Sequence, residues 1–307
     1  MNKKIKLILQ LGITFGLFYI LLKNVNINSI EFKLSILSFI LFSLALILKL
    51  IAIFWNTQIL KCAIKISEKN IKLETKRIYT IYFISYFFSV SGLGSLGSDS
   101  YKFISLKNIG FKSKKVFNFL IYEKIIGLVV LCSFLLISII YYFYLKKFYL
   151  YTFVPILILI VTFCLLLIIN RVQMIIPSKL KISKFLIHVR SDINSNKITF
   201  IYSLFYSLFF YLCIIFSFYF LTKIINPELP LLLSFFIIPS VLLLSSIPIS
   251  YQGFGIREVS IVYFFELLGY NAQQGLYVSI LLLIQNLIIV FFGGVLYLIN
   301  SLLEHNK

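Results

Sequence analysis

The residues of this chain that could take part in chemistry are those with ionisable side chains, and they are few. Only 13% of the 307 residues are Asp, Glu, Lys or Arg, whereas 61% are hydrophobic. Several charged residues nevertheless lie inside or beside long apolar runs, where a charge is unfavourable unless it has a partner or a function. Lys49 lies deepest in its run, so we expect it to be functional. The candidates for binding a substrate are Arg257, Glu258, Asp99, Lys124, Glu123 and Lys49.

Two polar, glycine-rich stretches carry some of these candidates. Ser91 to Lys102 reads SGLGSLGSDSYK, and Ser246 to Glu258 reads SIPISYQGFGIRE. Non-helical backbone at membrane depth is tolerated only where protein buries it or where it lines a wet cavity. We therefore expect each stretch to form the turn of a helical hairpin that lines a binding site. The expected turn residues are Gly94, Gly97, Gly253, Gly255 and Pro248.

The helices that would follow these turns suit an anionic ligand. They are expected to begin near Ser98 and Gly255, and helix N-termini attract anions, including phosphate. The planar guanidinium of Arg257 adds a permanent charge that matches phosphate oxygens. Two interpretations of Asp99 and Glu258 are open. They cap the first turn of their helices, or they pair with a cation (Lys124, Lys49 or Arg257) and exchange partners during a conformational cycle.

Two further polar pairs lie in apolar runs. Glu123 and Lys124 are near the start of theirs, so Lys124 either contacts substrate or extends its ammonium to the lipid headgroups. Gln285 and Asn286 lie within the last run, and the sequence favours hydrogen bonds between helices for them rather than ligand contacts.

No motif of an enzyme is present. The sequence contains no nucleophile elbow, no HExxH and no P-loop, and its four cysteines lack metal-ligand or CxxC spacing. We therefore expect no cofactor, no metal site and no enzymatic activity, although a role beside a synthase stays open.

The elements that must position these residues are membrane helices. With a mean hydropathy of +1.01, the chain is expected to be an all-α integral membrane protein. Its fold is expected to be one polytopic domain over residues 1–307, with about six full transmembrane helices and two re-entrant helical hairpins. The N-terminal run could be a signal peptide, but its length and the lack of a small-residue cleavage site favour a retained span. The expected spans are 5–22, 34–59, 116–145, 149–170, 198–222 and 276–303, and the short apolar segments are 78–90, 231–247 and 256–268.

Charge predicts how the spans are oriented. The net charge of +19 comes from lysines in short loops, which indicates cytoplasmic loops and anionic lipid rather than nucleic acid. If residues 78–90 crossed the membrane fully, the lysines of 102–115 would lie outside, against the positive-inside rule. A re-entrant segment keeps them inside and places both termini in the cytoplasm.

An internal repeat is the second feature of the whole chain. A shift of 159 residues places three residues in or after the first stretch on residues of the same kind in or after the second. The first hairpin would enter from inside and the second from outside, as in the inverted-topology repeats of transporters. The alternative is chance similarity between two loops of a low-complexity chain. The expected repeats are 78–145 and 231–303, and the matched pairs are Gly94 with Gly253, Asp99 with Glu258, and Gly110 with Gly269.

These stretches resemble the two signatures of the lysylphosphatidylglycerol synthase transmembrane family, also called flippase-like. The chain departs from the usual pattern by lysine at positions 102 and 124, where arginine is usual, and by Gln285, where a basic residue is common. The first signature corresponds to Gly94, Gly97, Asp99, Lys102, Gly110, Glu123 and Lys124, and the second to Pro248, Gly253, Gly255, Arg257, Glu258 and Gly269.

The resemblance implies the membrane module without the soluble aminoacyl-transferase domain of long members. The implied function is translocation of an anionic or phosphorylated lipid or glycolipid across the cytoplasmic membrane. The alternative is a membrane subunit or scaffold of a lipid- or glycolipid-modifying synthase complex. Expected partners are membrane lipids of the anionic or polyprenyl-phosphate type, with a second copy of the chain or enzymes of glycan and lipid assembly as further candidates. The abundance of Ile, Lys, Asn and Phe indicates an AT-rich genome, which fits a protein of a bacterial inner membrane.

Overall fold

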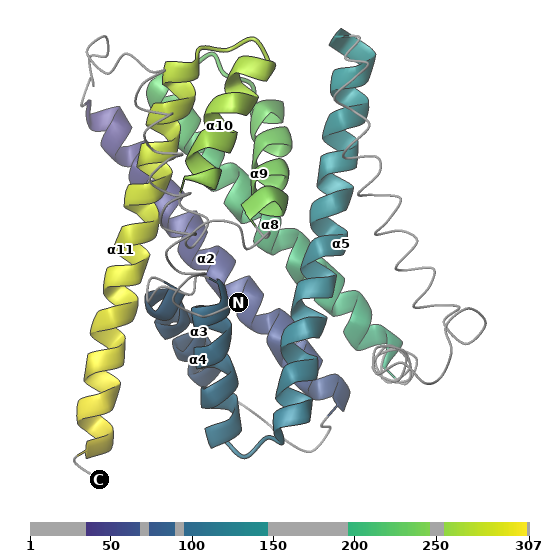
Figure 1. Cartoon of the computed structure of the whole chain (residues 1–307), viewed down its shortest axis with the longest axis vertical. Helices are drawn as coiled ribbons and strands as arrows, with labels where there is room; N and C mark the ends of the chain where they lie inside the picture. The colour runs from purple at the N-terminus through teal and green to yellow at the C-terminus, as the bar shows by residue number, and fades with distance from the viewer. Residues whose placement is uncertain (1–34, 68–73, 90–94, 147–195, 246–254, 306–307) are drawn as a thin grey trace, which may run out of the picture. The chain divides into compact units, whose positions relative to one another are not determined.

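Helices are the regular elements of the structure wherever it is described. The computed structural model describes residues 35–67, 74–89, 95–146, 196–245 and 255–305 (Figure 1). All regular elements within these ranges are α-helices, which confirms the all-α part of the expected fold class. They are α2 (Ile36–Ser67), α3 (Thr75–Ser89), α4 (Ser95–Asn108), α5 (Ser113–Lys146), α8 (Lys197–Ile225), α9 (Leu231–Ser245), α10 (Ile256–Leu267) and α11 (Ala272–His305).

Four of these helices are long and apolar enough to cross a membrane. At 1.5 Å per residue, about 20 apolar residues cover a hydrocarbon core of about 30 Å. The candidate spans coincide with four of the six predicted ones, so the protein is a membrane protein. The predicted spans 5–22 and 149–170 lie outside the described residues. The observed spans are Ile36–Ile66 in α2, Ser113–Ser138 in α5, Lys197–Ile225 in α8 and Ala272–Leu303 in α11.

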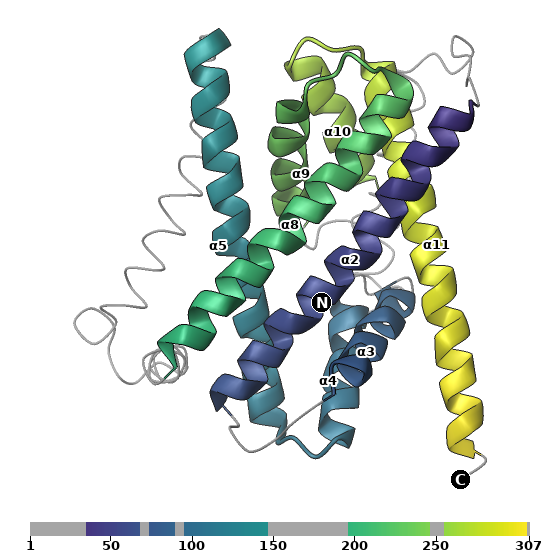
Figure 2. The same cartoon turned by 180° about the vertical axis from the view of Figure 1, so that it is seen from behind.

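The short helices form two hairpins. Helices α3 and α9 have 15 residues each, roughly 22 Å at helical rise and less than a full crossing. Helix α4 runs back along α3, where Ser98 donates to Ser85 at 3.1 Å. Helix α10 lies beside α9 in both views (Figures 1 and 2), with the rings of Phe236 and Phe264 5.5 Å apart. The structure thus contains two pairs of short helices where the sequence predicted hairpins.

The same turn ends α4 and α10. Gly110 and Gly269 have φ of +111° and +81°, a conformation that glycine adopts without strain. Each glycine donates its amide to the carbonyl three residues before it, at 2.9 Å in both turns, and the next residue donates to the carbonyl five before it. This is the Schellman arrangement, which satisfies the last carbonyls of a helix. A helix of 34 residues follows each turn, α5 after the first and α11 after the second.

The chain divides into two compact units, which we describe separately. Unit 1 comprises residues 1–50, 80–102 and 213–307, and unit 2 comprises residues 51–79 and 103–212. In unit 2, Tyr122 of α5 and Ser203 of α8 share a hydrogen bond of 2.7 Å. Trp55 of α2 packs on the aromatic residues of α8, with its ring 5.2 Å from that of Phe209.

Unit 1 is organised along α11. Gly275 lies against α10, where an added Cβ would be 3.0 Å from the backbone of Val262. Gly293 lies against α3, where an added Cβ would be 2.5 Å from the Phe83 carbonyl oxygen. These glycines let both hairpins approach the same long helix closely.

Candidate functional site

Lys49 is held between two helices of unit 1. Its side chain projects from α2 and is half-buried. The ammonium donates to Oδ1 of Asn286 and, at 3.4 Å, to Oε1 of Gln285, both on α11. The prediction that Gln285 and Asn286 form hydrogen bonds between helices is confirmed. Their partner, however, is the candidate ligand Lys49 itself.

A buried chain of hydrogen bonds continues from Gln285. This side chain is fully buried, and its Nε2 donates to Oγ of Ser217 on α8 at 2.8 Å. Ser217 in turn donates to the carbonyl oxygen of Ala45 at 2.8 Å. Ala45 lies one helical turn before Lys49 on α2, so three spans are tied together beside the ammonium. Sequence reasoning missed Ser217, because one serine among many in an apolar run gives no signal of its tertiary contact.

Arg257 supplies a second positive charge in unit 1. It is half-buried in the first turn of α10. Like Lys49, it belongs to unit 1. Within the described ranges, neither cation forms an ion pair with a carboxylate. Both cations are therefore candidates for binding an anion.

Glu258 stabilises the start of its own helix. Its side chain is buried, and Oε2 accepts a hydrogen bond of 2.7 Å from the amide of Gly255. Gly255 is the N-cap of α10, with φ of +83°. A carboxylate at this position satisfies a helix-start amide and interacts favourably with the helix dipole. Of the two interpretations that the sequence left open, capping is therefore the one seen for Glu258.

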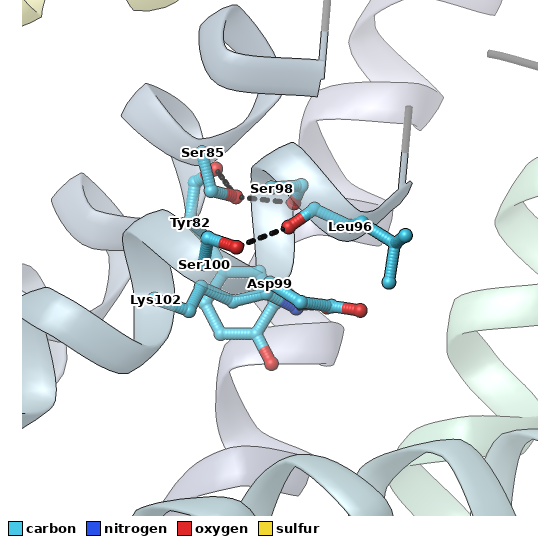
Figure 3. Close-up of polar contacts among 7 residues, drawn as sticks. All are labelled: Tyr82, Ser85, Leu96, Ser98, Asp99, Ser100 and Lys102. Carbon is cyan, nitrogen blue, oxygen red and sulfur yellow. Dashed lines mark hydrogen bonds and ion pairs between the residues drawn. The ribbon is translucent and has the colours of Figure 1, made fainter. Parts of the chain in front are cut away.

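Asp99 has a different environment in the first hairpin. Because α4 begins at Ser95 rather than near Ser98, Asp99 lies beyond the first turn, which contains no acid. The expected first-turn position was therefore wrong. Asp99 instead forms an ion pair of 3.4 Å with Lys102, one turn later (Figure 3). The Lys102 ammonium is also 4.6 Å from the centre of the Tyr82 ring, a cation–π contact that the sequence did not indicate.

The other predicted site residues are distributed over the chain. Glu123 is half-buried and Lys124 is exposed, and both belong to α5 in unit 2. Gly97 is part of α4 rather than of the preceding turn, so the turn assignment was wrong for it. The predicted turn residues Gly94, Gly253 and Pro248 lie outside the described residues.

We compared the sequence with models of protein families and with curated proteins. The family model of the lysylphosphatidylglycerol synthase TM region matches residues 7–294. It is the family whose signatures the two glycine-rich stretches resemble. A search of curated proteins finds no match to the chain.

Proposed function

The chain belongs to the lysylphosphatidylglycerol synthase transmembrane family, and from this premise we propose that it translocates an anionic or phosphorylated lipid or glycolipid across the cytoplasmic membrane. The family description supports a membrane module concerned with lipid modification. The translocated headgroup would bind at Lys49 and Arg257 in unit 1. Glu258 and Asp99 would contribute by supporting α10 and α4, the helices that frame the hairpins.

The observation that carries the proposal is the pair of cations without carboxylate partners. Lys49 lies on a membrane span and Arg257 at the start of a helix, and neither forms an ion pair with an acid among the described residues. A charge in or beside a membrane span is unfavourable unless an opposite charge approaches it. A phosphate-bearing headgroup supplies that charge, and its oxygens match both the guanidinium and the ammonium.

Movement across the membrane would come from the two hairpins. We take α3–α4 and α9–α10 as the re-entrant parts of an inverted repeat, entering from opposite sides. The equal lengths of α5 and α11, and the identical turns before them, support this repeat. Rocking of one copy against the other would expose the headgroup site to each side in turn. Glu123 and Lys124 would meet headgroups on α5, where the exposure of Lys124 supports contact with lipid.

The test is headgroup movement in proteoliposomes that contain the purified full chain. Lipids with a fluorescent acyl chain and either a phosphatidylglycerol or a phosphatidylcholine headgroup report movement when dithionite quenches the outer leaflet. We expect Lys49→Met and Arg257→Gln each to slow phosphatidylglycerol movement by about tenfold or more, the loss of one charge-assisted contact. Lys107→Met and Arg77→Gln are matched controls, because both residues are exposed. Equal rates in the site variants and the controls would refute the site.

A membrane subunit of a synthase is the second candidate function. The family description itself names a lysylphosphatidylglycerol synthase, which favours a partner that modifies the lipid covalently. Co-purification of such an enzyme, together with lipid modification that is lost when either protein is removed, would support this role. Headgroup movement by the purified chain alone would support translocation instead.

A further inference from the structure

Lys49 is held by neutral groups, and this determines the charge of the site. Two amide oxygens, from Gln285 and Asn286, accept hydrogen bonds from its ammonium. Amides satisfy an ammonium without cancelling its charge, whereas a carboxylate in the same place would form an ion pair. An ammonium has three N–H donors, so one remains for a ligand oxygen after both amides are bound.

Ser217 fixes which end of the Gln285 amide faces the ammonium. An amide side chain presents a carbonyl oxygen at one end and an NH₂ group at the other, and the NH₂ end would repel Lys49. The single hydroxyl proton of Ser217 is donated to the Ala45 carbonyl, so toward Gln285 the serine oxygen can act only as an acceptor. It therefore requires the NH₂ group, and the carbonyl oxygen turns to Lys49.

Because the network is buried, the Gln285 amide has only one favourable orientation. Gln285 and Ala45 are fully buried, and Ser217 is 2% exposed, so water cannot replace a missing partner in this network. A buried polar network is favourable only when each member is satisfied. Reversing the Gln285 amide would place two donors against each other at Lys49 and two acceptors against each other at Ser217.

From these contacts we propose that Gln285, positioned by Ser217, is the residue that makes the site select headgroups of net negative charge. The inference rests on the proposed function, because it concerns the same Lys49–Arg257 site. The substrate class is a lipid with an unneutralised phosphate. A zwitterionic headgroup is disfavoured because its own cation meets Lys49 and Arg257, which form no ion pair with an acid in the described part of the chain. Gln285 and Ser217 are thus positioning residues rather than ligands.

The selectivity ratio tests this role. In the same proteoliposomes, the rate for phosphatidylglycerol is divided by the rate for phosphatidylcholine, which removes differences in the amount of active protein. We expect Gln285→Glu, which has nearly the same shape, to lower this ratio by about tenfold or more, because an ion pair with Lys49 replaces the ligand charge. Ser217→Ala should lower it less, since the amide is released but stays neutral, and Ser217→Thr should restore it. Gln274→Glu is the matched control, the same change at a half-buried position of α11.

The outcomes separate the inference from the function on which it rests. A wild-type protein that moves no phosphatidylglycerol refutes the proposed translocation. A wild-type protein that moves it selectively, with an unchanged ratio in Gln285→Glu, refutes only the role of Gln285. If Gln285→Glu does not fold, Asn286→Asp carries the test, because it places a carboxylate beside the same ammonium at a half-buried position. An unchanged ratio in that variant also overturns the inference.

Discussion

The charged residues of unit 1 show that equivalent positions in the two hairpins have different tasks. Asp99 and Glu258 are 159 residues apart and follow the same glycine spacing. Asp99 is paired with Lys102 within α4, whereas Glu258 accepts the amide that precedes α10. The residue that precedes each acid also differs, serine in the first hairpin and Arg257 in the second. The charge of Asp99 is thus balanced within α4, whereas the second hairpin contributes Arg257 to the candidate site.

A first prediction at the residue scale concerns Glu258. Glu258→Ala should lower the free energy of unfolding by about 0.5–2 kcal/mol, the usual range for losing a helix cap. Glu258→Gln should have a smaller effect, because an amide oxygen can still accept the Gly255 amide. Thermal unfolding of the purified protein in detergent measures both. Glu266→Ala is the control, since Glu266 is exposed on the same helix. A Glu258→Ala variant as stable as the control would show that the bond of 2.7 Å does not stabilise α10.

Sequence reasoning identified the ionised residues of the site better than their partners. Lys49 and Arg257 stood out because a charge in an apolar run is rare and needs a reason. Ser217 did not, because its importance arises only when α8 brings it to the turn of α2 that precedes Lys49. The partner of Asp99 was missed for a local reason, since α4 begins earlier than the glycine spacing suggested.

At the scale of elements, long apolar runs predicted the four observed spans. The ends of the helices depended instead on glycines and on local turn geometry. The four observed spans agree with the prediction because their length and hydropathy suffice to define them. The ends of α4 and α10 depend on Gly110 and Gly269, whose positive φ permits the closing turn. The start of α4 depends on local turn geometry, which no single residue type in the stretch determines.

A second prediction concerns the contact between α3 and α11. Gly293→Ala places a Cβ 2.5 Å from the backbone oxygen of Phe83, which cannot move without shifting α3. We expect a loss of about 1–3 kcal/mol in the free energy of unfolding, typical of overpacking. Gly294→Ala is the matched control, because its Cβ meets the ring of Phe87 at 2.8 Å, and a ring can rotate away. In detergent, Gly293→Ala should therefore unfold at a lower temperature than Gly294→Ala. The reverse order would contradict the close approach of the α3 and α11 backbones.

At the scale of the whole molecule, the distribution of charge supports the proposed repeat. The exposed lysines around Gly110 and the basic start of α3 lie in unit 2, at the two ends of α3–α4. If α3 and α4 together enter and leave the membrane on one side, both basic segments remain in the cytoplasm. In the second hairpin, Glu228 lies before α9 and Glu266 in the last turn of α10, and no lysine lies between Lys223 and the end of α10. This asymmetry fits hairpins that enter from opposite sides.

The last prediction tests this topology directly. In a variant without the native cysteines, Lys112→Cys should react with a membrane-impermeant maleimide only from the cytoplasmic side, in inside-out vesicles. Glu228→Cys should react only from the outer side, in intact cells. Both residues are exposed and lie at helix connections, Lys112 before α5 and Glu228 between α8 and α9, so labelling reports sidedness rather than burial. Labelling of Lys112→Cys from outside would mean that α3 crosses the membrane fully. The two hairpins would then not be inverted copies, and the rocking proposed for translocation would lose its structural basis.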